Sequence, residues 1–268
     1  MEERTGQMIA LCDSAIHLWL AFYDQITDAR LLEQYRELLT EAERMQETRY
    51  FFAHDRKRYL VTRALTRTVL SKYSSVRPHD WLFVNDRYGR PLVANAEANS
   101  LAFNISHTKG LIALAVTNGG AIGVDVENLQ AREGSLEIAD RFFSPSETAI
   151  LRETSHECLQ YRFFEYWTFK EAYIKARGMG LSLPLDKFSF HYPDDRTVGI
   201  EIDPQLGDHP ERWQFRQFQP DKGYVLALCA ERRVPGGPKL VVIQTVPMVS
   251  QMRVSAEILR RSREITTH

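Results

Sequence analysis

A predicted helix over about residues 158–177 constrains this chain most, because three charged residues stand inside a run of aromatic and aliphatic ones. The helical pattern ends at Gly178, which predicts a left-handed glycine cap for the helix. Glu171 and Lys175 lie four residues apart on one face, and Lys170 lies beside them, so one side offers a carboxylate flanked by two ammonium groups. Taken alone, this pattern is more typical of a solvated helical salt bridge than of a site.

A second acidic cluster changes that interpretation. The sequence GVDVE over residues 123–127 is typical of a strand, and its alternation places Asp125 and Glu127 on one face. Two carboxylates that are neighbours on one strand face repel each other unless a cation lies between them. The strand and the helix together therefore favour a charged site over two unrelated surface features.

Composition limits the classes of function. The chain has 268 residues, is 44% hydrophobic and carries a formal net charge of -1, so it can bury a core and form two lobes, and no global charge selects nucleic acid. Three widely spaced cysteines argue against a disulfide framework or a zinc site, and with the charged N-terminus they predict a cytoplasmic protein without a membrane anchor. The stretch from Arg49 to Lys72 concentrates positive charge suited to an anion, with a single acidic residue against Arg49, Arg56, Lys57, Arg58, Arg63, Arg67 and Lys72.

The first half reads as a strand, three helices and then a group of strands. We expect a strand over residues 14–23, followed by helices over about 31–39, 40–49 and 55–72. Strands over 101–106, 111–116 and 121–127 are separated by turn sequences, which predicts a meander with a hairpin at residues 118–120. Within it, Ser106 and His107 are adjacent in extended backbone and point apart, so they do not suit a nucleophile and its base. His107 is either a turn residue or a donor to an anion.

The second half begins with helices and ends with strands. Ser144 and Glu147 form a capping-box pattern with proline at the first helical position, which predicts a helix start there. Four strands are expected over residues 188–191, 198–202, 213–218 and 224–229. The tail over residues 244–268 is too weakly patterned to assign, apart from a helix expected around 255–263.

The acidic residues of strand and helix suggest a metal site. Asp125, Glu127 and Glu171 offer the hard oxygen ligands that Mg²⁺ prefers, and this ion is usually completed by water and substrate phosphates. Lys170, Lys175, His107 and the basic helix supply donors around it. We expect a small substrate carrying a pyrophosphate, attacked at one phosphorus atom.

Three motifs in this order resemble the Sfp-type 4′-phosphopantetheinyl transferases: FNISH at residues 103–107, GVDVE at 123–127 and WxxKEAxxK at 167–175. The resemblance extends over about residues 40–190. It implies an α+β pseudo-dimer of two similar lobes, each a small, mainly antiparallel sheet packed with helices, with the active site in the cleft between them. We assign residues 1–120 to the N-terminal lobe, 121–243 to the C-terminal lobe and 244–268 to a tail without an assigned role.

The family resemblance also implies an activity. Its members transfer the phosphopantetheine arm of coenzyme A to a serine of an acyl or peptidyl carrier protein and release adenosine 3′,5′-bisphosphate. Asp125, Glu127 and Glu171 match the magnesium ligands, and either Glu127 or Glu171 would take the proton from the serine. By the same resemblance, contacts to coenzyme A would come from Lys170 and Lys175 at the pyrophosphate, His107 and Arg58 at phosphates, Ser106 at backbone or phosphate, and Arg90 near the adenine.

The sequence departs from the best-known broad-specificity members at one place. Where those place two lysines before the basic helix, this chain has Glu43 and Gln46. This shifts the expected grip on the 3′-phosphate to Arg58 and its neighbours Arg56 and Lys57.

Two other function classes use the same residues. A magnesium-dependent pyrophosphohydrolase would use the three carboxylates with water as nucleophile, and a binding module would hold coenzyme A or a carrier protein without chemistry. We expect a monomer that binds neither nucleic acid nor membranes. The sequence does not distinguish carrier proteins of fatty-acid, polyketide or nonribosomal peptide synthesis, nor whether an acyl group is tolerated on the coenzyme.

Overall fold

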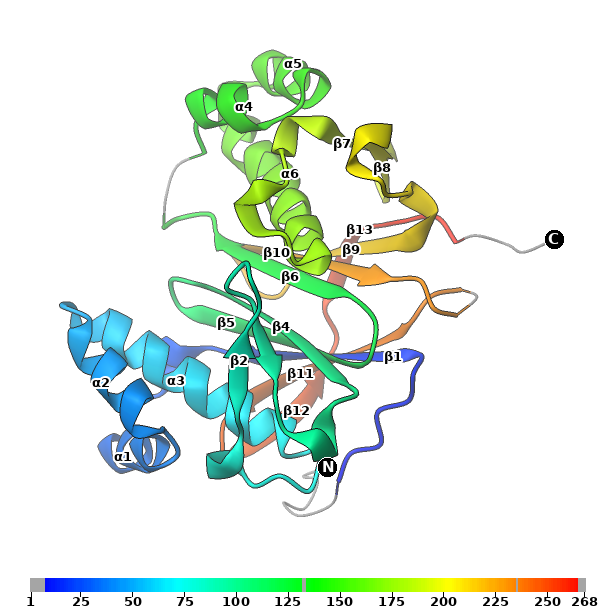
Figure 1. The fold of residues 1–268 in the computed structure, drawn as a ribbon. Helices are drawn as coiled ribbons and strands as arrows, with labels where there is room; N and C mark the ends of the chain where they lie inside the picture. The colour runs from blue at the N-terminus through cyan, green and yellow to red at the C-terminus, as the bar shows by residue number, and fades with distance from the viewer. Residues whose placement is uncertain (1–7, 132–133, 235, 265–268) are drawn as a thin grey trace.

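The computed structural model describes residues 8–131, 134–234 and 236–264 as an α+β protein in which two β-sheets pack face to face between helices (Figure 1). The mixed α+β class predicted from the sequence is confirmed. The charged N-terminal residues 1–7 lie outside the described residues. Along the described part of the chain, no helix is both long and apolar enough to cross a bilayer.

The first sheet is built around β1 (Ala15–Ala21), whose seven residues are all buried. Its strand order is β12-β11-β1-β5-β4. One face of β1 packs on the helices through residues such as Trp19, while Leu18 on the other face packs toward the second sheet. The remaining elements of this half are α1 (Ala29–Glu37), α2 (Glu41–Arg49), α3 (Ala53–Leu70), β4 (Leu101–Thr108), β5 (Leu111–Asn118), β11 (Lys239–Val246) and β12 (Ser250–Val254), with a separate hairpin of β2 (Phe83–Asn85) and β3 (Pro91–Val93).

The second sheet has the order β6-β10-β9-β13-β8-β7 and is covered by the long helix α6 (His156–Arg177) (Figure 1). Aromatic residues of α6, among them Phe169 and Tyr173, pack on Phe215 of the sheet. Gly178 caps α6 with a φ of 66°, as the sequence predicts. The other elements are β6 (Ile122–Asn128), α4 (Leu136–Phe142), α5 (Pro145–Glu153), β7 (Phe188–Asp194), β8 (Thr197–Ile202), β9 (Trp213–Gln219), β10 (Tyr224–Glu231) and β13 (Glu257–Arg261).

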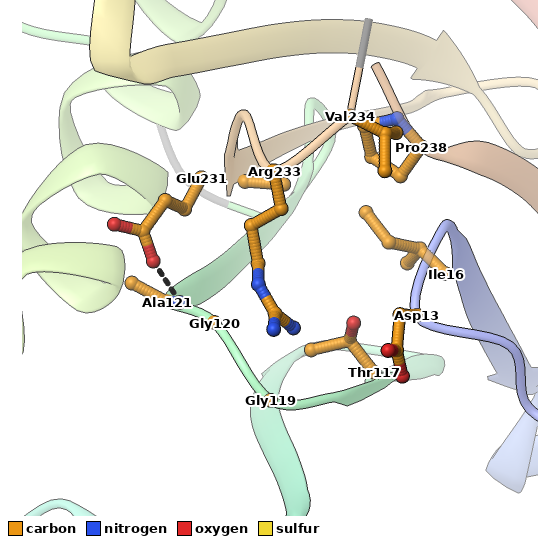
Figure 2. Close-up of a pocket in the computed structure, with 11 residues that line it drawn as sticks. Asp13, Ile16, Thr117, Gly119, Gly120, Ala121, Glu231, Arg233, Val234 and Pro238 are labelled. Atoms are coloured by element: carbon orange, nitrogen blue, oxygen red, sulfur yellow. Dashed lines mark hydrogen bonds between the residues drawn. The ribbon is translucent and has the colours of Figure 1, made fainter.

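The predicted meander is wrong at its third strand. β4 and β5 pair as expected, but β6 pairs with β10 in the second sheet. The glycines at 119 and 120 do make the turn, with φ of 73° and 78°, yet the chain leaves the first sheet there. Arg233 lies across this connection (Figure 2), and its guanidinium donates to the Asn118 carbonyl at 2.7 Å. The pairing of β6 with β10, about a hundred residues later in the chain, therefore replaces the pairing of β6 with β5 that the turn sequence predicts.

The two sheets meet along β4 and β6 through side chains of β4. Asn104, Ser106 and Thr108 stand at alternate positions and accept hydrogen bonds from backbone N–H groups of β6, at 2.9, 3.2 and 3.1 Å. These bonds satisfy the edge of β6 that has no strand beside it. They hold the acidic strand in register against the first sheet.

The C-terminal segment corrects a second expectation. Residues 257–261 form strand β13 beside β9, not a helix over 255–263. Before it, β11 pairs in parallel with β1, so residues 239–254 return to the first sheet and the chain then crosses to the second (Figure 1). The division of the chain into lobes at residues 120 and 243 stays a prediction.

Candidate functional site

β6 and α6 lie in direct contact because Gly123 has no side chain. A methyl group there would overlap the carbonyl oxygen of Ala172 and lie 2.5 Å from the backbone nitrogen of Ala176. Asp125 and Glu127 follow at alternate positions of the same strand, so they occupy the face of β6 that packs on α6. The acidic strand and the charged helix, predicted separately, are thus neighbours.

Asp125 is the centre of a hydrogen-bond network that joins three elements. Its Oδ1 accepts from the Lys175 ammonium of α6 at 2.7 Å and from the Ser106 hydroxyl of β4 at 2.9 Å. Lys175 also donates to the Ser106 hydroxyl at 3.0 Å and to the Val124 carbonyl at 3.1 Å. Asp125 is 5% exposed, so this charge pair is shielded from solvent on its acidic side.

The second oxygen of Asp125 is different. Oδ2 is buried and has no hydrogen-bond partner among the described residues. A buried carboxylate oxygen without a donor is costly, and a cation or a donor from a ligand would satisfy it. Glu127 follows on the same strand face, and Glu171 stands one helical turn before Lys175; both are half-buried.

The carboxylate oxygens of Asp125, Glu127 and Glu171 are chemically suited to a hard cation. In their present arrangement, however, the described residues include no group of three or more His, Cys, Asp or Glu side chains that could hold a metal ion. The Lys175 ammonium supplies the positive charge beside Asp125 in this arrangement. Three carboxylate side chains from β6 and α6, one with an unsatisfied oxygen, match the ligands that Mg²⁺ takes in proteins.

His107 lies on the neighbouring strand β4 and carries a positive charge when its imidazole is protonated. The residue keeps an exposed surface, yet protein atoms around its ring and the positive charges of Arg58 and Lys175 lower its pKa, against the opposing effect of Asp125. Arg58 of α3 is thus near enough to His107 for its charge to affect the pKa of the imidazole. Arg58 is held by Asp55, one turn earlier, at 2.7 Å.

Arg90 approaches from the hairpin of β2 and β3. Its backbone N–H donates to the Asp86 carboxylate at 3.0 Å, which closes the turn. Its guanidinium lies against the C-terminal cap of α6, where a methyl group on Gly178 would be 3.2 Å from Nη1. Burial lowers the pKa of Arg90, and its Nε is buried without a hydrogen-bond partner in the part of the chain that the structure describes. Such a donor suits a polar ligand.

Lys170 does not belong to this site, which corrects the expectation that it contacts a pyrophosphate. Its side chain is fully buried, pairs with Glu147 at 2.7 Å and donates to the carbonyls of Leu185 and Phe188 at 2.7 and 2.8 Å. Five residues correspond to 140° around a helix after whole turns are removed, so Lys170 and Lys175 point to different sides of α6. Lys170 fixes α6 to α5 and to the start of β7.

Glu43, where the family resemblance leads one to expect a lysine, has a structural role. Its carboxylate accepts from the Thr40 backbone N–H at 2.9 Å, which completes a capping box at α2. The same oxygen accepts from Arg67 at 2.7 Å, and the Arg67 side chain is only 1% exposed. Glu43 therefore neutralises a buried arginine of α3.

Sequence reasoning missed Asn104 and Thr108, which align β6 beside β4 together with Ser106. The signal was available, since three polar side chains at alternate positions of a strand must share one face. Without the partner strand, that pattern is equally typical of a solvated face.

Comparisons with known proteins match the part of the chain that carries these site residues. The family model for the 4′-phosphopantetheinyl transferase superfamily matches residues 121–229, and the model for the N-terminal part of 4′-phosphopantetheinyl transferases matches residues 27–119. A 4′-phosphopantetheinyl transferase from Bacillus subtilis is 36% identical over 190 residues, which cover 70% of this chain and 81% of the relative. The Sfp transferase of Bacillus subtilis is 33% identical over 74% of this chain and 84% of its own length.

A more distant relative covers still more of the chain. The 4′-phosphopantetheinyl transferase HetI of a Nostoc species is 30% identical over 82% of this chain and 90% of that protein. Among solved structures, the holo-[acyl-carrier-protein] synthase of Thermotoga maritima matches 47% of this chain and 69% of its own, with 16% identity and a TM-score of 0.34. At that score, the likeness is too weak for a comparison of architectures.

Proposed function

Because the chain belongs to the Sfp-type 4′-phosphopantetheinyl transferases, we propose that it transfers the phosphopantetheine arm of coenzyme A to a serine hydroxyl of an apo acyl or peptidyl carrier protein. The serine oxygen forms a bond to the β-phosphorus of the pyrophosphate. The bond from that phosphorus to the bridging oxygen breaks, and adenosine 3′,5′-bisphosphate leaves.

The observation that supports this proposal best is the network around Asp125. Lys175 holds an ammonium group beside Asp125 and Ser106, between the two sheets. Phosphoryl transfer needs little covalent chemistry from the protein, and most of the rate comes from alignment and from positive charge near the phosphate oxygens. The Lys175 ammonium beside the Asp125 carboxylate provides that charge for a bound pyrophosphate.

Asp125, Glu127 and Glu171 would hold Mg²⁺. When bound, the ion neutralises charge on the phosphates and orients them. The unpartnered Oδ2 of Asp125 supports this assignment, because it is a buried, negatively charged acceptor without a donor among the described residues. Glu127 or Glu171 takes the proton from the carrier serine as its oxygen attacks.

The remaining contacts to coenzyme A come from three cationic or neutral donors. His107 and Arg58 lie on the side of the first sheet and its helix, and Arg90 lies at the C-terminal end of α6. Coenzyme A would therefore lie where the two halves of the chain meet. In this proposal the two halves are the lobes on either side of the active-site cleft. The proposed site needs no residue from a second copy of the protein, and we propose that it acts as a monomer.

Mass spectrometry of a carrier protein tests the proposal. A panel of apo carrier proteins from fatty-acid, polyketide and peptide synthesis is incubated with the protein, coenzyme A and Mg²⁺. We expect at least one carrier to gain the mass of phosphopantetheine, and a carrier with alanine in place of its serine to gain nothing. If no member of the panel is modified while coenzyme A remains intact, the transfer proposal is wrong.

A parallel incubation without a carrier protein separates transfer from hydrolysis. A pyrophosphohydrolase would consume coenzyme A under these conditions, whereas a transferase would leave it intact. A binding module would leave coenzyme A intact with and without the carrier.

A further inference from the structure

A cavity of about 400 Å³ opens at one end of the core between the two sheets. Its walls come from β9 of the second sheet, from β11 of the first and from the segment that carries the chain from β12 to β13. Protein interiors contain few voids larger than a water molecule, while ligand pockets span roughly 300–1,000 Å³. The size of this cavity is therefore that of a small-molecule site.

The inner wall of the cavity is apolar because it continues the core between the sheets. Phe218 and Val242 are buried members of that core, and Leu240 and Val254 pack against it. Ile258 lies nearer the mouth and is 39% exposed. An apolar body entering the cavity would be removed from water along its length, which stabilises binding in proportion to the area buried.

The mouth of the cavity carries an excess of positive charge. Three cationic residues, Arg216, Lys239 and Arg261, line it against one carboxylate, Glu264. Glu264 lies 3.9 Å from Arg261, and both side chains are 62% exposed, so this ion pair is weak. The rim therefore offers net positive charge to a ligand.

Arg216 is the cation that most needs a partner. It is half-buried and donates to the Pro238 carbonyl at 2.6 Å, but it forms no ion pair with the residues that the structure describes. Burial and the neighbouring Arg261 lower its pKa, against the opposing charge of Glu264. A half-buried guanidinium in such a position usually has a partner for its charge, and a bound anion would supply it.

We propose that this cavity binds a small anionic amphiphile, a carboxylate or phosphate carried on an apolar chain or ring. The anionic head meets Arg216, Lys239 and Arg261, and the apolar body lies against Leu240 and Val254. The site is separate from the network around Asp125 and does not depend on the transferase activity. Because its walls belong to both sheets, a bound ligand stabilises their packing and raises the temperature of unfolding.

Calorimetric titration and thermal unfolding of the full chain with octanoate test the proposal. Octanoate combines both features, octanamide has the same body without the charge, and acetate and inorganic phosphate have charge without the body. We expect saturable binding of octanoate with a rise in unfolding temperature, and binding of the other three that is weaker by roughly tenfold or more.

Variants locate the binding. Arg216→Gln should weaken octanoate binding by roughly tenfold, whereas Arg30→Gln, at an exposed arginine far along the sequence, should leave it unchanged. Ile258→Asp, which places a carboxylate at the mouth, should also weaken it and decides the matter if Arg216→Gln does not fold. The proposal is overturned if octanoate does not saturate the protein, if octanamide, acetate or phosphate binds as tightly, or if Arg216→Gln or Ile258→Asp folds and binds octanoate like the parent.

Discussion

Lys170 and Lys175 show how two residues of one helix acquire different roles. Lys170 is enclosed by protein and paired with Glu147, whereas Lys175 reaches Asp125 and the Ser106 hydroxyl between the sheets. Burial lowers the pKa of Lys170, and the charge of Glu147 opposes that change. An ion pair of this kind fixes structure, since removing one partner leaves the other charge buried.

We therefore expect Lys170→Met to lower the free energy of unfolding by about 3–5 kcal/mol, because Glu147 would remain buried and charged. Adding Glu147→Gln should recover much of that loss, since glutamine keeps the shape but not the charge. Urea unfolding measures both effects. The double variant should also retain kcat/KM for transfer within about threefold, whereas a loss of on the order of 100-fold would mean that Lys170 contacts the substrate after all.

His107 should make coenzyme A binding depend on pH. Its pKa is lowered by the protein atoms around the ring and by the charge of Arg58, so the free protein holds a neutral imidazole at neutral pH. A bound pyrophosphate raises this pKa, and binding is then favoured as pH falls through the pKa of the bound state. We expect KM for coenzyme A to fall between about pH 8 and about pH 6, with a smaller dependence in His107→Gln. Identical pH profiles for the two proteins would exclude a contact between His107 and the substrate.

Single residues were predictable where the chemistry is local. The alternation of Asp125 and Glu127 and the spacing of Glu171 and Lys175 follow from strand and helix periods alone. The sequence did not show which lysine near Glu171 faces the site, Lys170 or Lys175, because the partner of Lys170 lies 23 positions earlier in another helix.

At the scale of elements, the site depends on how closely β6 approaches α6. A side chain at Gly123 would meet backbone atoms of Ala172 and Ala176, which cannot move independently of the helix. Gly123→Ala should therefore separate strand and helix, lower the free energy of unfolding by about 3 kcal/mol and reduce kcat/KM by about 100-fold. Gly207→Ala is the matched control, since a methyl group there has no heavy atom within 4 Å and meets only the cost of its left-handed backbone. Equal losses in the two variants would mean that the contact is unimportant.

Elements that carry their own stop and start signals were predictable from the sequence. The capping boxes at Thr40 and Ser144 and the left-handed cap at Gly178 are present in the structure, because each depends on residues within a few positions. β13 was mistaken for a helix because a short, polar strand owes its conformation to the neighbouring strand β9. The turn at residues 118–120 was found, but its sequence does not determine which strand β6 pairs with.

At the scale of the whole molecule, the C-terminal segment completes both sheets. β11 lies beside β1 in parallel, and β13 lies between β9 and β8. A parallel partner that arrives more than two hundred residues later leaves no local signal in the sequence. For this reason the tail could not be assigned, although the α+β class could.

Truncation tests that role. A chain ending at Pro238 lacks β11, β12 and β13, so β1, which is buried on both faces, would become an exposed edge. We expect this chain to lose its cooperative thermal transition and to aggregate, while a chain ending at Glu264 should unfold like the parent. Circular dichroism and size-exclusion chromatography measure both. A cooperative transition in the shorter chain would show that the segment is dispensable.

The account as a whole depends on three acidic side chains of β6 and α6 acting through Mg²⁺. The most direct measurement is the rate of carrier-protein modification as a function of Mg²⁺ concentration, for the parent, Asp125→Ala, Glu171→Ala and the exposed control Glu201→Ala. We expect the control to match the parent, and both site variants to fold but to lose on the order of 100- to 1,000-fold in rate. Near-parental rates in either site variant at the same low Mg²⁺ concentration would contradict the proposed metal site.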